Sequence, residues 1–148
     1  MLLGVEGSWV VKRKPGFTLE NLKEDYHAYF LNFRYNLPEI NSYVDLKVGR
    51  FLAGDKGVRI DFTKKIGSID ISVWYSFTDT SVFKDSYNRG YHDKGIMFTL
   101  PLKWITGKEN KTVYSYAITP WTRDVAQFPY VESLFNFIQS IFKYPFKF

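Results

Sequence analysis

The feature that most constrains this chain is a regular alternation of apolar and polar residues. From Ser68 to Thr78 every odd position is apolar, and every even position except Trp74 is polar. Successive side chains of a β-strand point to opposite faces, so this segment predicts a strand with one apolar and one polar face. On the apolar face we expect Ile69, Ile71, Val73, Tyr75 and Phe77, whereas Ser72, Ser76 and Thr78 face away.

The same alternation recurs along the chain between turn signals at residues 53–57 and 64–67. The predicted strands are 6–14, 26–37, 43–52, 58–63, 68–78, 95–105 and 113–119. The longest polar connection is 79–91. We therefore predict an all-β fold, an antiparallel meander of about seven or eight strands that forms a β-barrel or part of one. Segment 26–37 is longer than most strands of soluble domains and suits a tilted membrane strand.

The tail changes character. Apolar residues from Tyr130 to Phe142 recur at helical spacing, which predicts a short C-terminal helix. The alternating aromatics from Phe142 to Phe148 resemble the last strand of an outer-membrane barrel, but Pro145 would remove a ladder hydrogen bond. We divide the chain into a β-barrel region, residues 1–124, complete or part of a larger barrel, and an amphipathic tail, residues 125–148.

Composition excludes several classes of protein. Cysteine is absent, so there is no disulfide, thiolate chemistry or cysteine metal site. No apolar run approaches the ~18 residues of a membrane-spanning helix, whereas alternating strands of a membrane barrel leave only a weak hydropathy signal. The net charge of +5 is dispersed and accompanies no nucleic-acid motif, so we expect no nucleic-acid partner. We also expect no cofactor and no metal.

The chain offers little for catalysis. Of its two histidines, His92 adjoins Asp93, but neighbouring residues on a strand point to opposite faces and do not make a triad. The carboxylates on the polar strand faces are scattered, as solvated residues are. We therefore expect no enzymatic activity and no catalytic residue.

Four glycines, Gly49, Gly54, Gly57 and Gly95, lie near the ends of predicted strands. Glycine permits the positive φ angles of tight turns and bulges, so we predict that these residues form turns and set the strand register. We expect a positive φ at Gly54 and Gly57. Asp55 can hydrogen-bond the turn backbone beside them.

Three motifs resemble those of a known family. Residues 48–57, VGRFLAGDKG, are similar to GRYLAGD-x-G, and HDKGI at 92–96 followed by Pro101-Leu102 resembles FDKGI…IPL. Thr122-Arg123-Asp124 resembles the start of TRDGG. The motifs occur in this order in the YjbH-type family of outer-membrane proteins tied to exopolysaccharide and capsule production. His92 stands where that family has Phe, and Val125-Ala126 replace its two glycines.

The resemblance implies a location in the bacterial outer membrane and a non-enzymatic role in exopolysaccharide or capsule secretion or assembly. The implied partners are outer-membrane lipid, extracellular polysaccharide and other polysaccharide-secretion proteins. Family members are several times longer and begin with an export signal, whereas residues 1–5 are too short for one. The chain is thus expected to be a C-terminal portion or a shortened relative. The predicted polysaccharide-contacting or lumen charge-network residues are Arg50, Asp55, Trp74, His92, Asp93, Lys94, Arg123 and Asp124.

A second hypothesis is a soluble lipocalin-like or β-sandwich carbohydrate-binding module, in which the apolar face fills the inside of the sheet. The two hypotheses differ in where the apolar face points. For the membrane barrel we predict these outward residues: Tyr29, Leu31, Phe33, Ile71, Val73, Phe98 and Leu100. We predict that Asp70, Ser72, Thr99 and Lys103 point to a polar interior or water, with Met97 the exception on that face.

Overall fold

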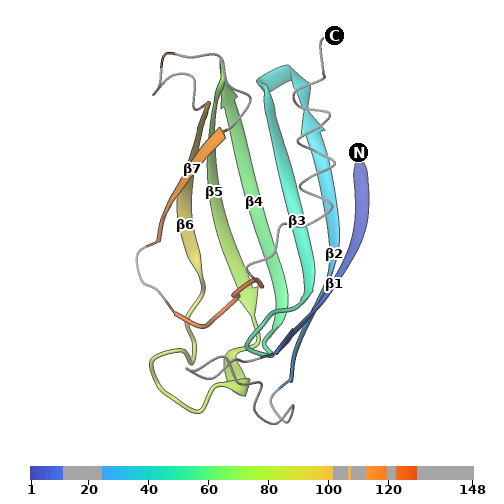
Figure 1. Ribbon diagram of the computed structural model, residues 1–148, viewed down its shortest axis with the longest axis vertical. Coiled ribbons are helices and arrows are strands. Elements are labelled where there is room, and N and C mark those ends of the chain that lie inside the picture. Colours follow the sequence, from blue (N-terminus) through green and yellow to red (C-terminus); the bar gives the residue numbers. More distant parts are fainter. Residues whose placement is uncertain (12–24, 102–106, 108–112, 120–122, 130–148) are drawn as a thin grey trace.

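A computed structural model describes residues 1–11, 25–101, 107, 113–119 and 123–129. Seven antiparallel strands follow one another in chain order in a single sheet (Figure 1). The strands are β1 (Leu2–Val11), β2 (Asp25–Leu37), β3 (Ser42–Arg50), β4 (Lys56–Ile66), β5 (Ile69–Thr78), β6 (Lys94–Pro101) and β7 (Val113–Ile118). Two 3-10 turns, η1 (Pro38–Ile40) and η2 (Thr80–Val82), follow β2 and β5. The predicted all-β meander is confirmed.

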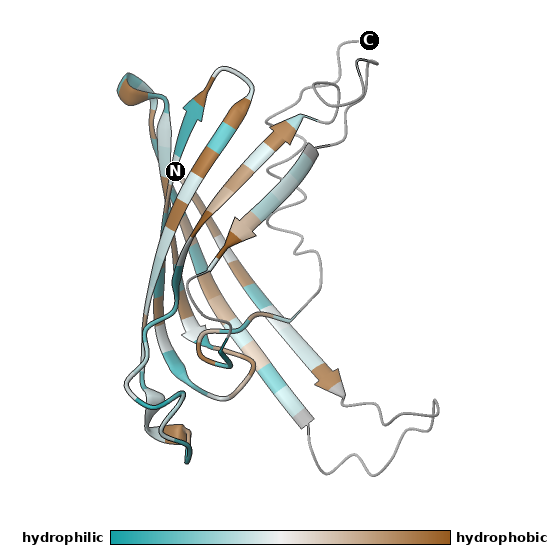
Figure 2. Cartoon of the chain, turned by 90° about the vertical axis from the view of Figure 1, so that its left-hand side faces the viewer, coloured by the Kyte–Doolittle hydropathy of each residue, from teal (hydrophilic) through white to brown (hydrophobic). Residues whose placement is uncertain are grey.

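The sheet curves into a half-barrel, seen from the side in Figure 2. Each strand pairs with its neighbours in sequence, and in the part of the chain that the structure describes β1 pairs only with β2 and β7 only with β6. One edge of β1 and one edge of β7 are therefore left without a described partner strand. Among the same residues, no helix is long and apolar enough to cross a membrane.

The alternation predicted from the sequence is confirmed along β5. Ser76 is 0% exposed, whereas Val73 and Phe77 on the opposite face are 44% and 54% exposed. The cross-strand register extends these two faces over the sheet, and Figure 2 shows the alternating hydropathy along the strands. The buried face is concave and mostly polar, and the outer face is apolar and open. The following large apolar residues are exposed on the outer face: Leu3, Val5, Tyr29, Leu31, Tyr35, Val48, Ile60, Phe62, Val73, Tyr75, Phe77, Ile96, Tyr116 and Ile118.

The individual predictions of direction follow the same register. All seven residues predicted to point outward lie on the outer face, since Phe33 is paired with Leu46 and Ile71 with Phe98. Asp70, Ser72 and Thr99 lie on the concave face, and Met97, opposite Ser72, is the predicted exception there. Lys103 lies outside the described residues, as does the predicted helix from Tyr130 to Phe142 with its strand alternative.

A small apolar core occupies one end of the concave face. The rings of Phe30, Phe51 and Phe128 lie 5.1–5.3 Å apart, and Val125 and Ala126 are buried beside them. Segment 123–129 therefore crosses the concave face, as Figure 1 shows, and the predicted boundary between residues 124 and 125 passes through it. The backbone N–H of Leu52 donates to the carbonyl of Gln127 at 2.9 Å and holds the segment there.

The glycines correct one prediction. Gly54 lies in the turn between β3 and β4 with φ +96°, but Gly49, Gly57 and Gly95 lie within strands, and no positive φ occurs at Gly57. A Cβ at Gly49 would stand 1.9 Å from the carbonyl oxygen of Tyr29, and at Gly57 2.0 Å from that of Phe77. These two glycines permit close strand approach, which the sequence does not distinguish from a turn. The turn predicted at 64–67 is shorter, because β4 continues through Ile66 and reverses at Gly67 and Ser68.

Candidate functional site

The concave face carries a cluster of charges centred on Arg59 of β4. Its guanidinium donates from Nε and Nη2 to the carboxylate of Asp61 at 2.8–3.1 Å, and Nη1 lies 3.8 Å from Oδ2 of Asp93. The cation stands 4.7 Å from the ring centre of Trp74 and 5.0 Å from that of Phe128. Arg59 is thus held by two carboxylates and two aromatic rings, with about 15% of its side chain exposed.

Trp74 and Asp93 were both predicted, and the structure joins them. The indole Nε1 of Trp74 donates to Oδ2 of Asp93 at 2.8 Å, and both residues are buried. Gly95 lies against the indole, since a Cβ there would come within 2.4 Å of Cζ2. With one cation beside the ring and only 7% of the residue exposed, Trp74 has no open face on which a sugar ring can stack.

Two further ion pairs line the concave face toward β1 and β2. Lys47 of β3 lies 3.9 Å from the carboxylate of Glu6, which also accepts a 3.0 Å hydrogen bond from Nδ2 of Asn32. Arg34 forms a bidentate ion pair with Asp45, its direct cross-strand partner. Arg34, Lys47 and Arg59, all partly buried, are thereby each paired with a carboxylate, which offsets the cost of burying charge.

Sequence reasoning did not select these residues as site residues, although the signal was present. Asp45 and Lys47, and likewise Arg59 and Asp61, are charged residues two positions apart on the polar faces of neighbouring strands. Period-two charges on adjacent antiparallel strands lie side by side once the register is known. The register β3–β4 places Asp45 opposite Asp61 and Lys47 opposite Arg59, so each carboxylate lies diagonally from a cation.

Asp55 lies deep at the end of the half-barrel, where it holds segment 123–129. It is 0% exposed, and its Oδ2 accepts the backbone N–H of Ala126 at 2.9 Å. Burial raises the pKa of this carboxyl, and the Ala126 N–H opposes the shift in part. The predicted turn residue therefore makes a contact 71 positions along the chain.

Arg123 and Asp124 connect the same segment to loop 79–93. The Arg123 guanidinium stands 3.9 Å from the ring centre of Tyr87 and 4.3 Å from that of Tyr91. Asp124 and Asn88 exchange two hydrogen bonds, of 3.2 Å from the Asp124 N–H and 3.1 Å from the Asn88 amide. These contacts hold segment 123–129 in place where Asp124 and Gln127 line a pocket.

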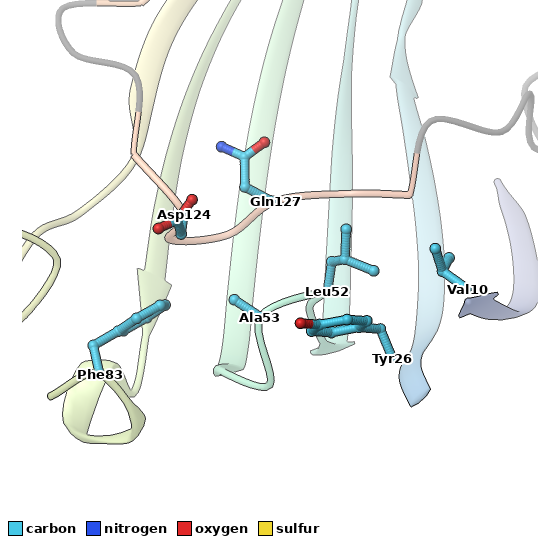
Figure 3. A pocket seen from close by; sticks show the side chains of 7 residues that line it. All are labelled: Val10, Tyr26, Leu52, Ala53, Phe83, Asp124 and Gln127. Carbon is cyan, nitrogen blue, oxygen red and sulfur yellow. The ribbon is translucent and has the colours of Figure 1, made fainter. Parts of the chain in front are cut away.

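A pocket of about 540 Å³ opens beside segment 123–129 at this end of the sheet. Figure 3 shows Asp124 and Gln127 on the segment that passes above Leu52 and Ala53, with Tyr26 beside them. The lining residues are Val10, Tyr26, Leu52, Ala53, Phe83, Asp124 and Gln127. The lining is mainly apolar with a few polar groups, as is common in small-molecule sites.

The remaining predicted residues, Arg50, His92 and Lys94, do not join the concave cluster. Arg50 is paired with Tyr29 and Lys94 with Tyr75, and both partners belong to the outer face. His92 stacks on Tyr75 there and makes a tilted ring contact with Phe77. The eight predicted residues are thus divided between three places: the concave cluster, the pocket end and the outer face. Over the described ranges, no three His, Asp or Glu side chains lie close enough to hold a metal ion.

Comparison with known proteins decides the family. A model of the YjbH family, described as "Exopolysaccharide biosynthesis protein YbjH", matches residues 1–140. The chain belongs to this family. The YjbH resemblance inferred from the three sequence motifs is confirmed.

Among curated proteins, the chain is similar to "Uncharacterized lipoprotein YjbH" of Escherichia coli (strain K12). The two are 33% identical over 84 residues, which are 57% of this chain and 12% of the relative. The chain thus matches a small part of a much longer YjbH protein. No solved structure matches the chain.

Proposed function

We propose that this chain forms part of an outer-membrane β-barrel that assists the secretion or assembly of an extracellular polysaccharide, without catalysing a reaction. The observation that carries the proposal is the direction of the apolar face. Leu3, Val5 and Phe77 are 61%, 86% and 54% exposed on the outer face, whereas Asn32 and Ser76 are almost fully buried on the concave face.

A soluble sheet does the reverse, because burial of apolar surface drives its folding. Contiguous apolar surface on this scale marks a contact with a membrane or another protein. Apolar residues outside and polar residues inside, alternating with period two, are typical of membrane strands. The described strands β1, β2, β4 and β5 have 10–13 residues, enough for a tilted strand to cross a bilayer. A soluble carbohydrate-binding module would require the opposite orientation.

Family membership supports the polysaccharide part of the proposal, since the family is described by exopolysaccharide biosynthesis. The Escherichia coli relative is named a lipoprotein, which supports an envelope location. The pocket beside segment 123–129 supplies sugar-binding chemistry, with the ring of Tyr26 as a stacking surface and Asp124 and Gln127 as hydrogen-bonding groups. The remaining partners of the half-barrel would be outer-membrane lipid and other polysaccharide-secretion proteins.

Membrane residence is tested with spin labels, because the chain contains no native cysteine. Single cysteines at Val73 and at its neighbour Ser72 place one label on each face of β5. In liposomes, the label at 73 should be accessible to oxygen and protected from a polar relaxant, and the label at 72 should not show this preference. A chain that is monodisperse without detergent, with the label at 73 open to the polar relaxant, would contradict the proposal.

The polysaccharide role is tested separately in a producing strain whose own copy is deleted. Tyr26→Ala and Asp124→Asn should lower secreted polysaccharide while the protein still inserts in the membrane. Glu39→Gln, at an exposed position in η1, is the control and should secrete as the unmodified protein does. Normal secretion by both pocket variants would remove the pocket from the proposal.

A further inference from the structure

The outer face ends in a row of basic residues that the concave site does not use. We propose that this row, the basic rim of Arg50, Lys56, His92 and Lys94, binds the phosphate groups of anionic membrane lipids. The inference rests on the proposed membrane residence of the half-barrel. It adds a lipid-binding site that lies on the opposite side of the sheet from the polysaccharide pocket.

The rim lies where four adjacent strands begin or end at the same end of the sheet. Arg50 is the last residue of β3 and Lys56 the first of β4, and the two are direct cross-strand partners. Lys94 is the first residue of β6, opposite Tyr75. His92, just before β6, stacks on Tyr75 and makes a tilted ring contact with Phe77 of β5, each at 5.8 Å between ring centres.

The rim cations differ from the concave cations in their pairing. Arg34, Lys47 and Arg59 each form an ion pair, but in the described part of the chain Arg50, Lys56 and Lys94 form no salt bridge. The charge of Lys56 acts on the carboxylate of Asp79, which also accepts the backbone N–H of Ser81, and Nζ of Lys94 donates to the backbone carbonyl of His92 at 3.3 Å. Three cations, Arg50, Lys56 and Lys94, against the one carboxylate of Asp79 leave the rim with a net positive charge.

The surroundings of the rim favour a lipid over a free phosphate ion. On the exposed apolar face Tyr75 lies opposite Lys94, whose Nζ is 5.8 Å from the Tyr75 ring centre, and Phe77 follows toward the end of β5. Aromatic rings beside basic residues at the border of an apolar band are the arrangement found at the level of membrane headgroups. An acyl chain can lie along the apolar face while its phosphate meets the rim.

The test compares two matched double variants of the full chain in detergent micelles. Lys56→Gln/Lys94→Gln removes two charges from the rim, and Lys64→Gln/Lys65→Gln removes two from the far end of β4. Native mass spectrometry measures how many phosphatidylglycerol and phosphatidylcholine molecules each protein retains from an equal mixture. Flotation with vesicles of the same two lipids measures membrane residence independently.

The unmodified chain should retain phosphatidylglycerol in preference to phosphatidylcholine. Each removed rim lysine should lower that preference about fivefold, which is roughly 25-fold for Lys56→Gln/Lys94→Gln. Lys64→Gln/Lys65→Gln should leave the preference unchanged. Equal losses in both double variants would overturn the rim, because they would reflect net charge alone. Loss of the preference on adding inorganic phosphate would also overturn it in favour of a free ion. If the protein floats with the vesicles but shows no preference for phosphatidylglycerol, the rim is wrong and the proposed function stands. If it prefers phosphatidylglycerol but does not float, the proposed function is wrong.

Discussion

The indole Nε1 of Trp74 donates a 2.8 Å hydrogen bond to Oδ2 of Asp93, and thereby connects the polar face of β5 to the loop that leads into β6. The same carboxylate faces the guanidinium of Arg59 at 3.8 Å. In addition, the backbone carbonyl of Asp93 accepts the N–H of Ser76 at 2.8 Å, beyond the last β5–β6 pair at Tyr75 and Lys94. One residue thus aligns β6 on β5 and closes the charge cluster of the concave face.

Trp74→Phe should destabilise the protein by about 2 kcal/mol, because it leaves a buried carboxylate without its neutral donor. The measurement is chemical unfolding in detergent micelles. Trp9→Phe is the matched control, since Trp9 is 64% exposed on the outer face, and it should change the free energy of unfolding by less than about 0.5 kcal/mol. Equal effects of the two substitutions on the free energy of unfolding would show that the Trp74–Asp93 hydrogen bond does not stabilise the fold.

Gly57→Ala should prevent normal strand pairing or cost more than about 3 kcal/mol, because the new Cβ would meet the Phe77 carbonyl oxygen at 2.0 Å. Backbone atoms of a paired strand cannot move aside without breaking the ladder between β4 and β5. Gly7→Ala, in β1, meets no atom within 4 Å and should be nearly neutral. Heat-modifiable migration on gels and far-UV circular dichroism report assembly, and an assembled Gly57→Ala protein of unchanged stability would contradict the prediction.

Asp55 should make stability depend on pH. Because its pKa is raised in the folded chain from 3.8, the folded state binds this proton more tightly than the unfolded state does. The contribution of Asp55 to stability is therefore largest below pH 3.8 and is lost as pH rises through the raised pKa. The side chain of Asp55→Asn cannot ionise and keeps an oxygen that accepts the Ala126 N–H. The melting temperature of this variant should therefore rise relative to that of the unmodified chain as pH increases above about pH 4.

The control for this pH series is Asp85, whose pKa shifts in the opposite direction. The backbone N–H of Asn88 lowers the pKa of Asp85, so its contribution is present above pH 3.8 and is lost as pH falls through the lowered value. Asp85→Asn should leave the slope above about pH 4 unchanged. If the melting temperatures of Asp55→Asn and of the unmodified chain changed with pH in the same way from acid to neutral pH, burial would not be raising the pKa of Asp55.

Asn88→Ala should loosen loop 79–93 from segment 123–129, because it removes both hydrogen bonds to Asp124. We expect faster amide hydrogen exchange in both segments, by roughly tenfold for a loss of about 1.4 kcal/mol in local stability. Asn36→Ala, at an exposed position of β2, is the matched control and should leave both segments unchanged. Unaltered exchange in the Asn88 variant would mean that Arg123 and its two tyrosines hold the loop alone.

The motifs and the strand faces were predictable because both depend on local order in the chain. The predicted strand 68–78 corresponds to β5 (Ile69–Thr78) with its predicted faces, because a two-residue period has one geometric solution in an extended strand. The site was less predictable. Gly57 and Gly95 are strand positions that accommodate a carbonyl and an indole, and sequence neighbours reveal neither. Arg50, His92 and Lys94 lie at turn motifs, yet cross-strand pairing places Arg50 and Lys94 on the outer face, and ring contacts with Tyr75 and Phe77 place His92 there.

Alternation by itself determined that this chain forms strands with an apolar and a polar face, because side-chain direction on a strand is a local property. It did not determine which face lies inside, since a period of two is the same for a soluble barrel and for a membrane barrel. The tertiary structure decided this through the curvature of the sheet and through segment 123–129, which crosses the polar face. Its anchor, the bond from the Ala126 N–H to Asp55, joins residues 71 positions apart, and only the folded chain brings such residues together.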